Sequence, residues 1–240
     1  MKIHSLILIT ALMIMGGLIG IAAAQDVCED PVTCDEETGI TADSATSNCC
    51  CCPCEPCIAP RTPGYWKNWN RCSGGGQADA ADRLNEGRGP VCGNGVYLLD
   101  DLLPLDIGCS LYPCDGCCLT IDNCEDAIAI LSAQDLDNSK NMNNDAAYKL
   151  ARDLLAARLN LAAGACEPGN DFKFCIKTRE FTLREVLCEA DYLLYHNIGF
   201  DGTGNYLGPK NKDPYGTRAY AISLHEIIDK YNNGEYYTGE

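Results

Sequence analysis

The residues of this chain that are best suited to chemistry are its cysteines. The sequence holds 18 cysteines, and they are densest between Cys28 and Cys57. Within this stretch Cys49/Cys52 and Cys54/Cys57 form two C-x2-C pairs, a spacing at which thiolates bind zinc. The cluster therefore offers two alternatives, a soft-metal site made of these four thiolates or a set of structural disulfides.

A signal-like segment at the start of the chain favours the disulfides over the metal site. Lys2 and His4 precede an apolar run, Leu6–Ile21, and Ala22–Ala24 supply small residues for cleavage before Gln25. We therefore predict a secreted or cell-surface protein, with an uncleaved membrane anchor as the alternative role of this segment. Thiols outside the cytosol oxidise, so disulfides are favoured over a metal site, and no cofactor is predicted.

We expect the cysteines to pair with one another, because their number is even. One predicted bridge joins Cys166 to Cys175 and closes the turn at Pro168–Asn170. The four consecutive cysteines cannot comfortably bridge neighbours, so they require distant partners or partners in another molecule. The disulfide candidates are Cys28, Cys34, Cys49, Cys50, Cys51, Cys52, Cys54, Cys57, Cys72, Cys92, Cys109, Cys114, Cys117, Cys118, Cys124, Cys166, Cys175 and Cys188.

An aromatic group, Tyr65, Trp66 and Trp69, supplies the candidate binding residues. Aromatic rings form platforms for the apolar faces of sugars and for peptides. The alternative is a core plug at the start of the folded domain, which we favour because tryptophan is highly buried on average.

One polar stretch has the alternating oxygen ligands of a calcium loop. It runs through Asp135, Asp137, Ser139, Asn141 and Asn143. The sixth position of the loop is lysine instead of glycine, and the twelfth is alanine instead of glutamate. We therefore predict an ordinary polar loop that caps the next helix.

The histidines give little support for catalysis. Only His196 and His225 remain after the signal segment, and we expect His225 to be structural because it lies beside an apolar helix stripe. The chain lacks the G-x-S-x-G and H-E-x-x-H patterns, and nothing places a base beside a nucleophile. No catalytic residue is assigned, and no enzymatic activity is expected.

The net charge narrows the range of partners. The chain carries 34 acidic against 18 basic residues, a formal net charge of −16. Such a chain repels nucleic-acid backbones and anionic lipid head groups. The acidic charge could attract divalent cations or a basic partner. The predicted export makes cell-surface or extracellular matrix components the expected partners, with self-association as a further expectation.

The elements that must position these residues are predicted to be mainly helical. Residues 25–60 form an irregular, Cys/Pro-rich stalk, in which prolines argue against helix as far as Gly64. Residues 61–240 form a disulfide-braced helical domain without strands of useful length. Helices are expected over 78–84, 96–103, 122–134, 145–163 and 218–231, and from a capping box at Thr182 and Glu185 onward.

The strongest helix pattern spans Asp145–Ala163. Alanine and leucine recur there at i, i+3 and i+4, and Gly164 is expected to close the helix. The polar residues Arg152, Asp153 and Asn160 lie away from this apolar stripe.

Three ordered motifs resemble those of a known family. They are Arg61–Asn68 (RTPGYWKN), Leu150–Asn160 (LARDLLAARLN) and Ile228–Gly234 (IDKYNNG). The chain is similar here to an uncharacterised domain of exported bacterial and archaeal proteins, with a T-x-G-Y-W-K start and an L-D-x-Y-N-N-G end. The resemblance covers about residues 61–240 and implies a secreted or cell-surface setting without a particular activity. Members often have a histidine where this chain has Trp69, so no role of that histidine carries over.

The sequence as a whole predicts a secreted or cell-surface structural or adhesive protein that disulfides stabilise. The alternatives are a metal-binding protein that uses the Cys49–Cys57 cluster and an extracellular hydrolase.

Overall fold

The structure is a computed structural model that describes residues 57–73, 77–85, 96–107, 119–169 and 171–237. This part of the chain is mainly helical, as predicted, whereas residues 1–24 and most of the predicted stalk lie outside the described residues. Its elements are α1 (Pro63–Asn68), α2 (Gln77–Leu84), the 3₁₀ turn η1 (Leu99–Asp101), β1 (Leu105–Ile107), β2 (Leu119–Ile121), α3 (Cys124–Leu131), α4 (Ala146–Ala162), β3 (Phe174–Ile176), β4 (Arg179–Phe181), α5 (Leu183–Tyr192), the π-helical turn η2 (Leu193–Ile198) and α6 (Thr217–Asn232).

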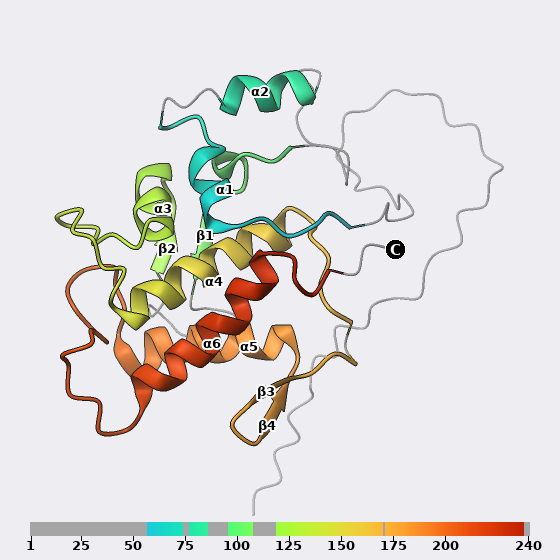
Figure 1. The fold of residues 1–240 in the computed structure, drawn as a ribbon. Coiled ribbons are helices and arrows are strands. Elements are labelled where there is room, and N and C mark those ends of the chain that lie inside the picture. Colours follow the sequence, from blue (N-terminus) through green and yellow to red (C-terminus); the bar gives the residue numbers. More distant parts are fainter. Residues whose placement is uncertain (1–56, 74–76, 86–95, 108–118, 170, 238–240) are drawn as a thin grey trace, which may run out of the picture. The chain divides into compact units, whose positions relative to one another are not determined.

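Helix α4 is the central element, and α1, α3, α5, α6 and β1 all pack against it (Figure 1). It begins where the Asp145 side chain caps the backbone N–H of Ala147 at 2.8 Å, and it ends before Gly164, whose φ is +79°. Leucine and alanine side chains are buried around almost the whole circumference of the helix. The packing around α4 also covers two polar residues, and Asp153 and Asn160 are completely buried.

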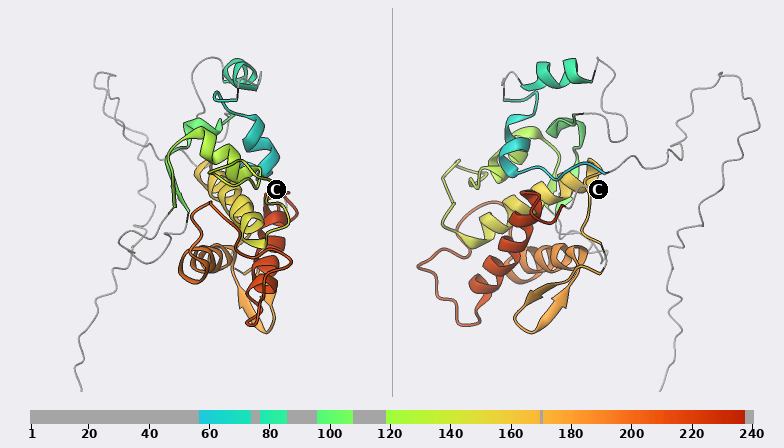
Figure 2. Two further views of the ribbon diagram at one scale, coloured as in Figure 1. Left: turned by 90° about the vertical axis from the view of Figure 1, so that its left-hand side faces the viewer. Right: turned by 45° about the vertical axis from the view of Figure 1, so that its right-hand side comes forward.

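Helices α4 and α6 run side by side in the same direction, as all three views show (Figures 1 and 2). The chain returns from the end of α4 to the start of α6 through the β3–β4 hairpin, α5 and a long loop. Helix α5 opens with the predicted capping box, in which the Thr182 hydroxyl accepts from Glu185 N–H and the Glu185 carboxylate accepts from Thr182 N–H. The observed α5 and α6 therefore follow the predicted boundaries closely.

The prediction that prolines exclude helix as far as Gly64 is wrong at its end. Helix α1 begins at Pro63, because proline at the first helical position loses no hydrogen bond there. The helix expected over 96–103 is also wrong, since only the single turn η1 forms there. The short strands were not predicted either. The pairs β1/β2 and β3/β4 are antiparallel and three residues long, too short for an alternating pattern.

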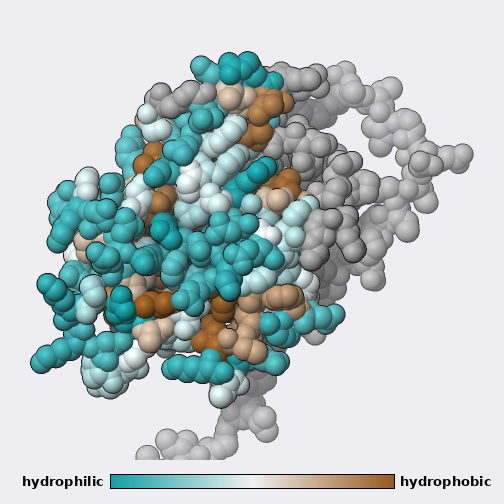
Figure 3. Space-filling model, viewed as in Figure 1, coloured by the Kyte–Doolittle hydropathy of each residue, from teal (hydrophilic) through white to brown (hydrophobic). Residues whose placement is uncertain are grey.

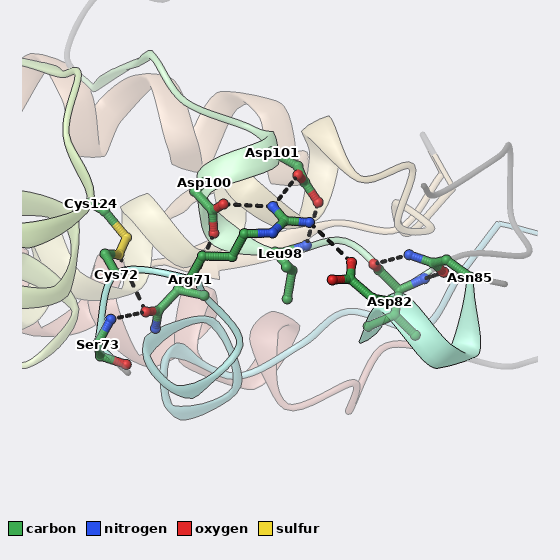
Figure 4. A network of polar contacts seen from close by, with 11 residues as sticks. Arg71, Cys72, Ser73, Asp82, Asn85, Leu98, Asp100, Asp101 and Cys124 are labelled. Carbon is green, nitrogen blue, oxygen red and sulfur yellow. Dashed lines mark hydrogen bonds and ion pairs between the residues drawn. A yellow bond between two sulfur atoms is a disulfide. The ribbon is translucent and has the colours of Figure 1, made fainter. Parts of the chain in front are cut away.

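One arginine braces the segment between α1 and η1 (Figure 4). Arg71 Nη1 contacts Asp100 at 2.7 Å and Asp101 at 2.8 Å, and its Nη2 contacts Asp82 of α2 at 3.3 Å. The hydrogen bonds that the guanidinium donates to Asp101 and Asp100 raise the pKa of Arg71. Next to it the Cys72–Cys124 disulfide fixes the chain after α1 to the start of α3.

The face of the molecule in Figure 3 is mostly hydrophilic, and its apolar residues form small separate patches. Within the described ranges, no helix combines the length and hydrophobicity that a membrane span requires.

Candidate functional site

The buried polar core of the site starts from Asn160 of α4, whose side chain has no exposed surface. Its Oδ1 accepts from the backbone N–H of Arg61 at 2.8 Å and from the indole N–H of Trp66 at 3.1 Å. Its Nδ2 donates to the Arg61 carbonyl at 2.8 Å and to Asn232 Oδ1 at 2.9 Å. One amide therefore joins the chain before α1, the α1 tryptophan and the end of α6 to the central helix.

Asp153, two turns earlier on α4, is the second buried polar centre. Its fully buried carboxylate pairs in bidentate fashion with Arg152, with Nε–Oδ1 2.9 Å and Nη2–Oδ2 3.0 Å. Oδ2 also contacts Nδ1 of His225 on α6, and the Asp153 carbonyl accepts from Asn232 Nδ2 at 2.9 Å. A buried carboxylate is expensive unless it is paired, and here it has a cation and a ring nitrogen as partners.

A pocket of about 350 Å³ is lined by Arg152, the partner of Asp153, and by neighbours of the other network residues along the chain. The polar side chains that line the pocket come from four elements. They are Thr62 and Lys67 of the α1 segment, Ser132 after α3, Arg152 of α4, Asp229 of α6 and Asn233 at its C-terminal end. Hydroxyl, amide, ammonium, guanidinium and carboxylate groups thus line one cavity. Such a wall is suited to binding a small polar ligand.

The electrostatics of the pocket centre on Arg152. Burial is the largest single influence and lowers the pKa of its guanidinium. The hydrogen bonds and the charge of Asp153, together with the charge of Asp229, outweigh burial, so the net pKa is raised. The side chain keeps 24% of its surface exposed. Asp153 accepts one N–H from Nε and one from Nη2, so both N–H groups of Nη1 and the second one of Nη2 are left for water or a ligand.

The predicted aromatic group divides into two roles. Trp66 is 1% exposed and fills the core, as the favoured alternative predicted. Tyr65 and Trp69 stack on each other at 5.2 Å and 15°, and the Arg61 guanidinium covers the Tyr65 ring at 5.2 Å. The Tyr65 ring therefore contacts both Trp69 and the Arg61 guanidinium, and its hydroxyl donates to the Tyr97 carbonyl. The three rings do not form a shared platform.

The predicted bridge between Cys166 and Cys175 is wrong. Cys166 is bonded to Cys57, 109 residues earlier, and Cys175 is an exposed thiol in β3. Backbone hydrogen bonds of Ile58 with Gly164 and Cys166 bring the two cysteine backbones together, which spacing along the chain could not reveal. This bond also removes one thiolate from the alternative metal set, whose other members lie outside the described residues.

The calcium-like stretch forms a polar loop. The Asp135 carboxylate accepts from the backbone N–H groups of Asp137, Asn138 and Gly204, and these bonds lower its pKa, with Gly204 as the largest cause. The loop ends at Asp145, which caps α4. The described residues contain no group of three or more His, Cys, Asp or Glu side chains that is arranged to hold a metal ion.

Sequence reasoning missed the buried residues of this site. Asp153, Asn160, His225 and Asn232 carry the network, yet none was selected as a site residue. The available signal was the presence of polar residues in an alanine-rich helix together with the three ordered motifs. In the fold these motifs meet, since Arg61 and Trp66, the α4 residues, and Asn232 are directly hydrogen-bonded.

Comparison of the chain with protein-family models, curated proteins and solved structures finds no match.

Proposed function

We propose that this chain is an exported structural or adhesive protein, in which a Cys-rich stalk attaches a disulfide-braced helical domain to the cell surface. The N-terminal segment supports export through its charged start, apolar run and small residues. The two described disulfides and the lack of a membrane-spanning helix among the described residues are compatible with an extracellular location.

The observation that carries the proposal is the disulfide between Cys57 and Cys166. Cys57 is the last cysteine of the predicted stalk, and Cys166 follows the central helix α4. Tension that enters through the stalk and leaves after Cys166 passes through this covalent bond. The chain between the two cysteines then bears no load. The disulfide thus transmits force directly and protects the helices between Cys57 and Cys166 from being pulled apart, which suits a protein under tension at a surface.

Two measurements test the proposal: whether the protein is exposed on the cell surface, and whether it stays bound to the cell envelope. Intact producer cells are labelled with a membrane-impermeant amine reagent, and the oxidised mature protein is separately bound to envelopes of the same cells. We expect surface labelling, a mature start at Gln25, and retention on washed envelopes. Labelling only after lysis, or complete loss from the envelopes on washing, would contradict an adhesive role at the surface.

A second function, an extracellular hydrolase, is favoured by one observation, the contact between His225 Nδ1 and the buried Asp153 carboxylate. In serine-type hydrolases such a carboxylate orients the catalytic histidine, whose other nitrogen takes the proton of the nucleophile. The described residues show no hydroxyl or thiol hydrogen-bonded to His225. The test is a panel of esters, peptides and glycosides with the wild type and His225→Gln. Turnover that the variant loses would favour the hydrolase.

A further inference from the structure

The pocket over α4 contains two charges of opposite sign that are not paired with each other. Lys67 and Asp229 are both half-buried. Within the described ranges the Lys67 ammonium has no ion-pair partner, and the same holds for the Asp229 carboxylate. In a chain with many surface charges such groups are usually satisfied by water. Here they line one cavity together with the guanidinium of Arg152.

Arg152 is held in place before any ligand arrives. Its bidentate bond to the buried Asp153 fixes the plane of the guanidinium, so little side-chain entropy is lost when Nη1 binds a ligand. Lys67 and Arg152 give the pocket two cations, although the chain has almost twice as many acidic as basic residues. Both groups can bind a carboxylate through charge-assisted hydrogen bonds, and Lys67 brings a charge that no carboxylate of the described residues balances directly.

Asp229 supplies the complementary charge. It faces the same cavity and acts on Arg152 electrostatically. A ligand that carried only a carboxylate would leave Asp229 beside another anion, which is unfavourable in a partly desolvated cavity. A ligand with an ammonium group next to its carboxylate satisfies all three side chains.

We propose that this pocket binds a small zwitterion, the α-amino acid group, with the carboxylate at Lys67 and Arg152 and the ammonium at Asp229. The volume of about 350 Å³ is at the lower end for small-molecule sites, which suits a single amino acid. The Thr62 and Ser132 hydroxyls and the Asn233 amide supply further hydrogen-bonding groups. This binding activity goes beyond the proposed adhesive role and does not depend on it.

The test is isothermal titration calorimetry of the oxidised full-length mature protein with the twenty common amino acids. For the best binder, the amide without a carboxylate charge and the N-acetyl form without an ammonium charge are titrated next. We expect each to bind about tenfold or more weakly than the amino acid, because each loses charge-assisted hydrogen bonds. The absence of binding by all twenty, equal affinity for the three forms, or preferential binding of glucose would overturn the proposal.

Variants assign the two ends of the ligand. Lys67→Met should weaken amino-acid binding about tenfold or more and leave affinity for the amide unchanged, and Lys67→Arg should keep binding. Asp229→Asn should abolish the preference for the amino acid over its N-acetyl form. Lys149→Met, which changes an α4 lysine outside the pocket lining, is the matched control. Wild-type affinity in both Lys67→Met and Asp229→Asn would show that the ligand binds elsewhere and would refute the proposal.

Discussion

At the residue scale, this protein depends on polar side chains that have lost all contact with water. Asp153 and Asn160 are fully buried in α4, and each joins α4 to α6. A buried polar network is favourable only when all its members are satisfied, so the partners cannot be changed independently. This is the reason for expecting large effects from small substitutions here.

Asp153→Asn is expected to lower the free energy of unfolding by about 3 kcal/mol, because it leaves the partly buried Arg152 without its counter-charge. Urea unfolding of the oxidised protein, followed by circular dichroism, measures the change. The matched control is Asp137→Asn, which changes an exposed aspartate and should stay within about 0.5 kcal/mol of the wild type. Equal stability of the two variants would show that the buried ion pair contributes nothing net.

Asp135 makes the stability of the folded protein depend on pH. Its pKa is lowered by the backbone N–H of Gly204 and then by those of Asp137 and Asn138, although burial acts in the opposite direction. The unfolded chain therefore takes up the proton first, so this stabilisation is present above the ordinary pKa of 3.8 and is lost as pH falls through the lower folded value.

We accordingly expect the urea midpoint of the wild type to fall steeply below about pH 4. Asp135→Asn should be less stable at pH 7 and should show a shallower decline between pH 5 and 3, because the titrating group is gone. Asp137→Asn should keep the wild-type slope. A slope that is the same in all three proteins would assign the acid sensitivity to other carboxylates.

At the scale of elements, the loop after η2 is locked to the polar loop before α4. Gly202 has a φ of +82°, and its carbonyl accepts from Leu136 N–H at 2.9 Å and from the buried Tyr148 hydroxyl at 2.8 Å. A Cβ at Gly202 would lie 2.4 Å from Leu136 Cδ1. Glycine is therefore required here for space as well as for backbone conformation.

Gly202→Ala and Gly204→Ala separate these two requirements. Both residues have positive φ, but a Cβ at Gly204 meets no atom within 4 Å. Each substitution should cost about 1 kcal/mol of backbone strain, and Gly202→Ala should cost about 1–3 kcal/mol more from overpacking. Thermal unfolding of both variants measures the difference. Equal losses would mean that Leu136 moves aside without cost.

At the scale of the whole molecule, the proposed load-bearing role depends on how the two described disulfides are nested along the chain. The Cys57–Cys166 disulfide encloses the segment that also contains the Cys72–Cys124 disulfide. A chain pulled from both ends cannot extend through the outer loop while the outer bond is intact.

Single-molecule pulling tests this arrangement. Removal of the outer bond by Cys57→Ser with Cys166→Ser should free 57 residues, the difference between separations of 109 and 52. At roughly 0.36 nm per residue this adds up to about 20 nm of contour length. Removal of the inner bond by Cys72→Ser with Cys124→Ser should add nothing while the outer bond remains. Equal contour length in all three proteins would refute the load-bearing role.

The sequence by itself determined the longer helices, because their apolar periodicity and caps are local properties of the chain. It missed α1 and predicted a helix over 96–103 that does not form. It correctly placed α4, α5 and α6 and favoured Trp66 as a core residue. The tertiary structure alone decided which cysteines meet, which polar residues become buried, and that three distant motifs line one pocket. Those outcomes depend on contacts across 52 to 109 residues, and no local pattern encodes the partner of a long-range contact.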